Sequence, residues 1–180
     1  NAIQVAVGDL YSWNEKSTYI QEPPFLAGLT REVKPIQSIR GARCLDLFAG
    51  SGALGLEALS RGAGYCDFVD TSAAAIRQIG LHLQTLHAGD RACCHQGPAL
   101  TFLQEDRACH DIVFIDPPFG RNLVDPICEQ LAGASRVSAG GFIYIEMAAH
   151  DREPTVPSNW RLHRERTAGE VAYRLFEMEG

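Results

Sequence analysis

The stretch Cys44-Leu45-Asp46-Leu47-Phe48-Ala49-Gly50-Ser51-Gly52 joins a short apolar run to a glycine-rich turn. Residues 44–48 are mostly apolar and end at the glycines, a pattern typical of a buried strand that leads into a tight turn. Residues 53–61 follow with apolar side chains at helical spacing, and Gly62 ends that helix. This strand, turn and helix predict the first unit of an α/β sheet.

The same alternation of short apolar runs and helical patterns continues toward the carboxyl terminus, which is typical of a mainly parallel sheet with helices on both faces. The predicted strands are 65–70, 92–95, 112–115 and 142–147, and the predicted helices are a long one capped by Ser72 and ending near His87, a short one around 100–103, and 123–132. Residues 160–178 are expected to form two further strands folded about Ala168-Gly169. We therefore predict a seven-stranded sheet with an antiparallel hairpin at its edge.

The length of 180 residues suits one domain, and 46% hydrophobic residues supply a core. Residues 1–40 do not follow the alternation, so they are expected to be an irregular accessory segment before a domain at 41–180. The net charge of −6 does not indicate a polyanionic partner, so nucleic-acid binding has to be argued from local residues.

The six cysteines lie mostly in apolar runs and form no C-x-x-C pair. This pattern favours reduced core thiols over a disulfide framework, and we expect no metal site. The sequence contains no apolar run long enough to span a membrane and does not begin with the basic and apolar regions of a signal peptide. A cytoplasmic location is therefore expected.

The turn at 50–55 has the spacing G-x-G-x-x-G, in which glycines let the backbone approach a ligand closely. Asp70 ends the next predicted strand, where a carboxylate can accept hydrogen bonds from ribose hydroxyls. Both features also suit a dinucleotide. Asp46 separates the two possibilities, because a buried carboxylate would repel a pyrophosphate but favours a ligand with an amino group or a sulfonium. The turn therefore favours S-adenosylmethionine over a nicotinamide cofactor.

A second motif, Asp116-Pro117-Pro118-Phe119, follows the predicted strand 112–115 and so lies at the ligand-binding edge of the sheet. The prolines fix the backbone and remove two donors, which leaves the Asp116 carboxylate and the Pro117 carbonyl as acceptors for an NH2 group. Phe119 supplies a flat apolar face on which a base could stack.

Together these motifs resemble a known family. The runs 44–61 (CLDLFAGSGALGLEALSR), 111–119 and 154–176 (PTVPSNWRLHRERTAGEVAYRLF) look like those of the bacterial 16S ribosomal RNA guanine-N2 methyltransferases. The resemblance runs from about Gly41 to Met178. It implies the Rossmann-like class I methyltransferase fold, S-adenosylmethionine as the methyl donor, and 16S ribosomal RNA or a small-subunit assembly particle as the partner.

The resemblance also implies the roles of individual residues. Asp46, Gly50 and Gly52 are expected to line the methionine part of S-adenosylmethionine, and Asp70 to hold its ribose. The full set expected at the cofactor is Asp46, Phe48, Ala49, Gly50, Ser51, Gly52, Asp70, Thr71 and Ala99. The set expected to hold the base and act in catalysis is Asp116, Pro117, Pro118 and Phe119.

Two alternatives stay open from the sequence. The D-P-P-F motif also suits a DNA adenine-N6 or cytosine-N4 methyltransferase, although the chain lacks room for a separate target-recognition domain. The glycine turn alone also suits a nicotinamide-dependent oxidoreductase or a nucleotide-binding module, and Asp46 and Asp116 argue against that class.

Overall fold

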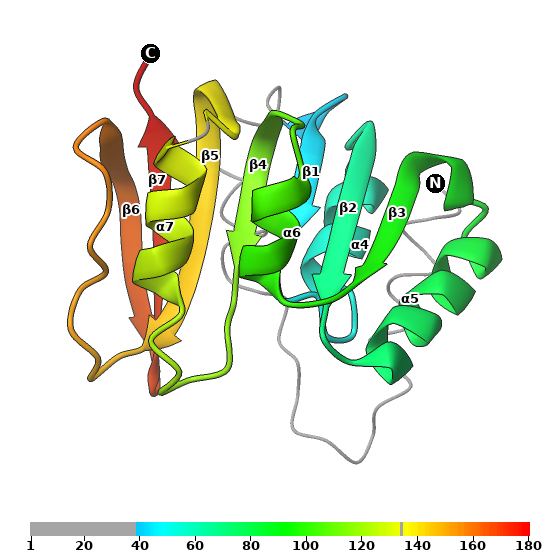
Figure 1. Cartoon of the computed structure of the whole chain (residues 1–180), viewed down its shortest axis with the longest axis horizontal. Helices are drawn as coiled ribbons and strands as arrows, with labels where there is room; N and C mark the ends of the chain where they lie inside the picture. The colour runs from blue at the N-terminus through cyan, green and yellow to red at the C-terminus, as the bar shows by residue number, and fades with distance from the viewer. Residues whose placement is uncertain (1–38, 134) are drawn as a thin grey trace.

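The computed structural model describes residues 39–133 and 135–180. These residues form one seven-stranded sheet in the order β3-β2-β1-β4-β5-β7-β6 (Figure 1). The strands are β1 (Arg43–Asp46), β2 (Tyr65–Asp70), β3 (Ala92–Gln96), β4 (His110–Ile115), β5 (Val137–Ala148), β6 (Trp160–Ala168) and β7 (Val171–Met178). The accessory segment predicted at 1–40 lies almost wholly outside the described residues and stays a prediction.

Strands β1 to β5 run parallel to one another, and β7 pairs antiparallel with both β5 and β6. The predicted mostly parallel sheet with an antiparallel C-terminal hairpin is therefore confirmed. Gly169 stands at the tip of this hairpin with a φ of 59°, a conformation that glycine adopts at little cost. Arg174 on β7 pairs with Glu165 on β6 at 2.7 Å, so the basic residues of the hairpin are in part neutralised across the strands.

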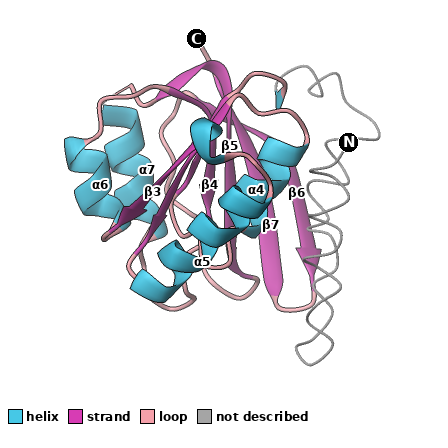
Figure 2. Cartoon of the chain, turned by 90° about the vertical axis from the view of Figure 1, so that its right-hand side faces the viewer, coloured by secondary structure: helices cyan, strands magenta, loops and turns pink. Residues whose placement is uncertain are grey.

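Helices cover both faces of the sheet, as Figure 2 shows. The helices are α4 (Ala53–Ser60) and α5 (Ala73–Thr85) on one face and α6 (Ala99–Glu105) and α7 (Val124–Gly133) on the other, with a short 3-10 helix at Gly89–Arg91. Ser72 caps α5 as predicted, since its hydroxyl accepts a hydrogen bond from the Ala75 amide at 3.2 Å.

Alternation along the strands divides the core into two layers, because successive side chains of a strand point to opposite faces. Phe68, Phe114 and Tyr144 pack on the α4 and α5 face, while Leu45 and Val113 pack on the α6 and α7 face. All five are completely buried. The central strands are therefore apolar on both faces, as expected of parallel strands between two helical layers.

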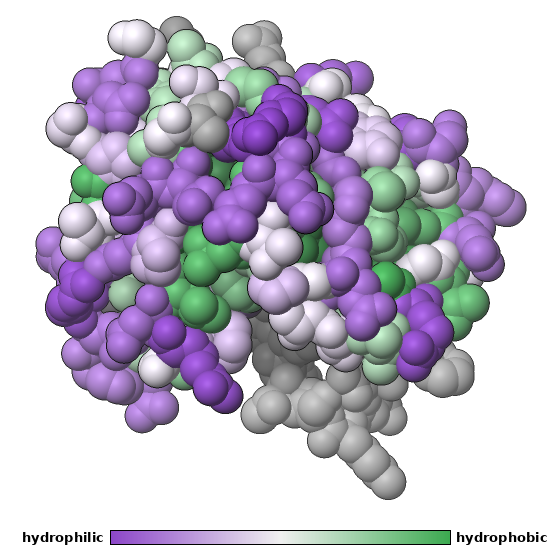
Figure 3. All heavy atoms as spheres, viewed as in Figure 1, coloured by the Kyte–Doolittle hydropathy of each residue, from purple (hydrophilic) through white to green (hydrophobic). Residues whose placement is uncertain are grey.

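Hydrophilic residues dominate the face seen in Figure 3, with apolar residues scattered between them. Within the described residues, no helix combines the length and the apolar character that crossing a bilayer requires. The large hydrophobic side chains that are exposed are Leu81, Phe119 and Leu162. Phe119 belongs to the D-P-P-F motif, so its exposed ring is available for the predicted stacking on a base.

Candidate active site at the carboxyl edge of the sheet

The predicted site residues come from different strands, yet the parallel sheet brings them to one edge. Asp46 ends β1, Asp70 ends β2, and Asp116 directly follows β4. Strand β1 lies between β2 and β4 in the sheet, so these three residues follow adjacent strands. The carboxyl edge of a parallel sheet is where ligands bind in α/β proteins.

The glycine turn has the backbone shape that the sequence predicted. Gly50 and Gly52 have φ values of 51° and 84°, in the left-handed region that favours glycine. The Asp70 carboxylate holds the turn in place, because it accepts hydrogen bonds from the amides of Gly50 at 2.8 Å and Ser72 at 2.7 Å. Asp70 thus stabilises the glycine turn, in addition to its predicted contact with ribose.

The third glycine of the motif permits close packing between α4 and β2. A Cβ atom at Gly55 would lie 2.2 Å from Cε1 of Phe68 and 2.8 Å from Sγ of Cys66, so only glycine fits there. This packing brings the Gly55 amide to 3.1 Å from the Asp46 carboxylate, to which it donates a hydrogen bond. The helix therefore stabilises the buried acid.

Asp46 is only 1% exposed, and this burial sets its protonation. Burial raises the pKa of Asp46 to about 7; the Gly55 hydrogen bond opposes this shift, and the nearby charge of Asp116 adds to it. Such a carboxyl is poised to ionise when a cationic ligand approaches. The predicted contact of Asp46 with S-adenosylmethionine stays a prediction.

The other residues predicted at the cofactor follow the same edge. Ala49 is buried and its amide donates to the Val69 carbonyl at 2.9 Å, while Ser51 and Thr71 are exposed. Phe48 is half-buried against the α6 and α7 layer. Ala99 begins α6, and Gln96 at the end of β3 pairs with Asp70, so β3 continues the row of candidate residues.

The D-P-P-F motif forms the turn between β4 and α7. Asp116 is half-buried, and burial raises its pKa above the ordinary value. Pro117 is buried, whereas Pro118 is exposed and the Phe119 side chain is 50% exposed. An exposed aromatic ring beside a carboxylate is suited to stacking on a planar ligand while the carboxylate accepts its hydrogen bonds.

A cavity of about 400 Å³ adjoins this motif, a volume within the range of small-ligand pockets. Its walls are residues 117–126, Glu146 and Met147 of β5, and Asp151 and Arg152 of the following loop. Asp125 near the start of α7 ties that loop to the helix, because it pairs with Arg152 and accepts from the Thr155 amide at 3.0 Å.

Glu146 is a candidate residue that the sequence analysis missed. Its Oε1 accepts a hydrogen bond from the Tyr144 hydroxyl at 2.6 Å, and burial followed by the charge of Asp116 raises its pKa to about 7. The signal was available, since a charged residue near the end of an apolar strand is what singled out Asp46.

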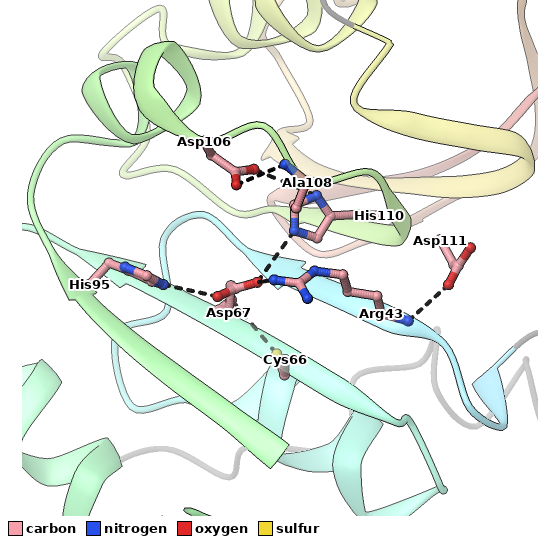
Figure 4. Close-up of polar contacts among 8 residues, drawn as sticks. All are labelled: Arg43, Cys66, Asp67, His95, Asp106, Ala108, His110 and Asp111. Atoms are coloured by element: carbon pink, nitrogen blue, oxygen red, sulfur yellow. Dashed lines mark hydrogen bonds and ion pairs between the residues drawn. The ribbon is translucent and has the colours of Figure 1, made fainter. Parts of the chain in front are cut away.

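A separate polar cluster lies on the α6 face and surrounds Asp67 (Figure 4). The Asp67 carboxylate contacts Arg43 at 2.6 Å, His95 at 2.9 Å and the buried His110 at 3.4 Å. A possible metal-ligand atom from each of three residues, Asp67, Cys93 and His95, lies within 4.8 Å of the other two. The ligands of a bound metal ion lie at similar distances from one another. Because the Asp67 carboxylate is already compensated by these three side chains, we interpret the cluster as a structural ion-pair network.

Comparison with known proteins identifies a family and similar solved structures. The family described as conserved hypothetical protein 95 matches residues 29–177. Ribosomal RNA small subunit methyltransferase D of Escherichia coli is 39% identical over 175 residues, which cover 93% of this chain and 87% of the relative.

Solved structures are also similar to this chain. The yhhF structure from Escherichia coli, at 38% identity, has a TM-score of 0.81 and covers 92% of this chain and 89% of its own. SMU.776, solved in complex with SAH, has a TM-score of 0.67 and covers 78% of this chain and 46% of its own; at 16% identity it shows likeness of fold alone. The chain has the class I methyltransferase fold and belongs to the conserved hypothetical protein 95 family, as the sequence resemblance implied.

Proposed function

We propose that this chain transfers a methyl group from S-adenosylmethionine to the exocyclic N2 amine of a guanine in 16S ribosomal RNA. The observation that carries the proposal is the adjacency of two motifs at one sheet edge. Asp46 with the glycine turn follows β1, and Asp116-Pro117 follows the neighbouring strand β4. The name of the Escherichia coli relative, a small-subunit ribosomal RNA methyltransferase, supports the substrate class.

The residues present fit S-adenosylmethionine chemically. Burial raises the pKa of both Asp46 and Asp116, and the negative charge of Asp116 raises the pKa of Asp46 further. A ligand that carries an ammonium and a sulfonium would relieve this repulsion, whereas a pyrophosphate would add to it. When bound, S-adenosylmethionine supplies an electrophilic methyl group.

The turn residues would bind and orient the donor. Asp46 would accept hydrogen bonds from its amino group, and the backbone at Gly50 and Gly52 would let it approach closely. Each Asp70 oxygen binds one backbone amide and retains a second lone pair, which is available to a ribose hydroxyl. Phe48, Ala49, Ser51, Thr71 and Ala99 would complete the walls along the edge.

Asp116 and Pro117 would orient the acceptor amine. The N2 lone pair of guanine is conjugated with the ring and is a poor nucleophile, so orientation has to supply much of the rate. Hydrogen bonds from the two N2 hydrogens to the Asp116 carboxylate and the Pro117 carbonyl would favour a pyramidal nitrogen. They would strengthen as positive charge develops on N2 in the transition state. The Asp116 carboxylate or water then takes the proton that N2 releases.

The cavity and Phe119 would hold the base itself. A target guanine has to leave its stack to reach the edge of the sheet, as chemistry on a base generally requires. The exposed Phe119 ring would stack on it, and Pro118 would provide a rigid neighbour.

The proposal is tested by tritiated methyl transfer from S-adenosylmethionine to undermethylated small-subunit particles, naked 16S RNA and DNA in parallel. The modified nucleoside is identified by mass spectrometry. Label in N2-methylguanosine supports the proposal, and the ratio of particle to naked RNA identifies the form of substrate. Label in N6-methyladenine or N4-methylcytosine of DNA would overturn it.

A further inference from the structure

Glu146 occupies a position for which the mechanism above has no use. Strand β5 runs parallel to β4 with Ile145 beside Ile115, so Glu146 and Asp116 are the next residues along two neighbouring strands. Neighbouring strands lie about 4.8 Å apart. Glu146 also shares its side of the sheet with Tyr144, one of the residues of the α4 and α5 layer.

The Glu146 carboxyl group is held in place by one hydrogen bond. The Tyr144 hydroxyl holds Oε1 at 2.6 Å, and this contact fixes the side chain at the wall of the cavity next to Pro117. Among the described residues, no Lys, Arg or His forms an ion pair with Glu146; the charge acting on it is that of Asp116. A half-buried carboxylate without a cation is stabilised when a ligand donates hydrogen bonds to it.

Guanine supplies a matching pattern of donors. Its Watson–Crick edge carries the N1–H group directly beside the N2 amine, so two adjacent carboxylates can accept from both at once. Adenine and cytosine present an acceptor nitrogen beside their amine instead, and that lone pair would face a carboxylate. A flipped base is commonly recognised through this edge.

We propose that Glu146 is a specificity residue that accepts a hydrogen bond from N1–H of the target guanine, while Asp116 and Pro117 hold the N2 amine. The proposal deepens the proposed function and depends on it. It accounts for a second carboxylate beside Asp116 at the ends of neighbouring strands, where amine methylation by itself needs one.

The test compares guanine with 2-aminopurine at the methylated position of 16S RNA, in whichever form of the substrate is active. 2-Aminopurine keeps the N2 amine but has an acceptor at N1. We expect wild-type protein to prefer guanine by about 100-fold or more in kcat/KM, since a site built to accept a hydrogen bond rejects an analogue that lacks the donor. Glu146→Ala should lower kcat/KM on guanine about 10- to 100-fold.

Glu146→Gln is the decisive variant, because its amide can donate to the N1 acceptor of 2-aminopurine as well as accept from guanine. We expect the preference for guanine to fall at least about tenfold in Glu146→Gln, with unchanged S-adenosylmethionine affinity and melting temperature. Glu129→Gln, at an exposed carboxylate on α7 that does not line this cavity, is the matched control and should keep the wild-type preference.

Two results would overturn the inference alone. One is an unchanged preference in Glu146→Gln, and the other is loss of cofactor affinity and folding in both Glu146 variants, which would make the residue structural. If wild-type protein forms a product other than N2-methylguanosine, the proposed function fails and the inference fails with it.

Discussion

Asp46 illustrates how one residue carries both structure and function. A carboxylate at the end of an apolar strand is costly to bury, so its presence in the sequence pointed to a polar partner. The Gly55 amide donates to it at 3.1 Å, and the Phe48 backbone also stabilises its charge, yet burial raises the pKa of Asp46 to about 7. A cationic ligand would stabilise the ionised Asp46 carboxylate.

This gives a pH prediction with a definite sign. The folded pKa of Asp46 lies above its ordinary value of 3.8, so its ionisation costs folding stability as pH rises from about 4 to 7. A cationic ligand binds the ionised form, so S-adenosylmethionine should bind up to about tenfold more tightly per pH unit between pH 5 and 7. Titration calorimetry on wild type and Asp46→Asn measures this. A slope that persists unchanged in Asp46→Asn would assign it to another group.

Phe119 allows a prediction about the acceptor side. Its exposed ring gains its partner only when a base is bound, so Phe119→Ala should leave folding and cofactor affinity unchanged. Loss of one stacked base should raise KM for RNA about 5- to 150-fold. Steady-state kinetics with varied RNA measures this, and Leu162→Ala, an exposed apolar residue on the edge strand β6, serves as the control. An unchanged KM would remove Phe119 from the base site.

The sequence predicted those candidate residues that stand out from their immediate neighbours along the chain. Asp46 and Asp116 stand out because each interrupts or ends an apolar run. Glu146 carries the same local signal, a charged residue near the end of an apolar run, but its position beside Asp116 depends on the pairing of Ile145 with Ile115. Strand register across a sheet is a tertiary property that a single sequence does not encode locally.

At the scale of elements, the contact between α4 and β2 fixes the geometry of the glycine turn. Gly55 allows the helix to approach Phe68, and this approach delivers the amide that binds Asp46. Cofactor geometry therefore depends on close packing of a helix against a strand.

Gly55→Ala should consequently affect both stability and binding. The added methyl group meets Phe68 and Cys66 in the core, and such overpacking typically costs about 1–3 kcal/mol. Urea unfolding measures this loss, and S-adenosylmethionine affinity should fall along with it. Gly80→Ala is the matched control, because a Cβ atom at that helical position meets nothing within 4 Å. Equal stability of the two variants would contradict the packing argument.

The bounds of the helices and strands could be predicted from the apolar pattern, except in β5, where glycines interrupt it. The strand predicted at 142–147 extends over Val137–Ala148. Gly140 and Gly141 fall inside it, with a φ of 73° at Gly140 and an irregular register against β4. A strand pattern broken by two glycines resembles a turn, and here the glycines mark a bulge.

At the scale of the whole molecule, the Asp67 network joins four strands, β1 to β4, on the face opposite Asp46. Although burial opposes it, hydrogen bonds from His110 and His95 and the charge of Arg43 hold the pKa of Asp67 below its ordinary value. Its contribution to stability is therefore present at neutral pH and is lost as pH falls below about 4.

Asp67→Asn should lower the free energy of unfolding at pH 7 by about 1–3 kcal/mol for each partner left unsatisfied. The difference from wild type should shrink when unfolding is measured near pH 3. Methyl transfer per folded molecule should stay unchanged, because Asp67 lies on the α6 face, away from the glycine turn. Loss of activity without loss of stability would give the network a functional role instead.

In the proposed reaction, Asp116 acts on the acceptor amine and not on the methyl donor. The most direct measurement is single-turnover methyl transfer together with S-adenosylmethionine affinity, both in wild type and in Asp116→Ala. We expect transfer to guanine to fall about 100-fold or more in Asp116→Ala, while the dissociation constant of S-adenosylmethionine changes by less than about threefold. Equal losses of transfer and affinity would contradict it and make Asp116 a structural residue.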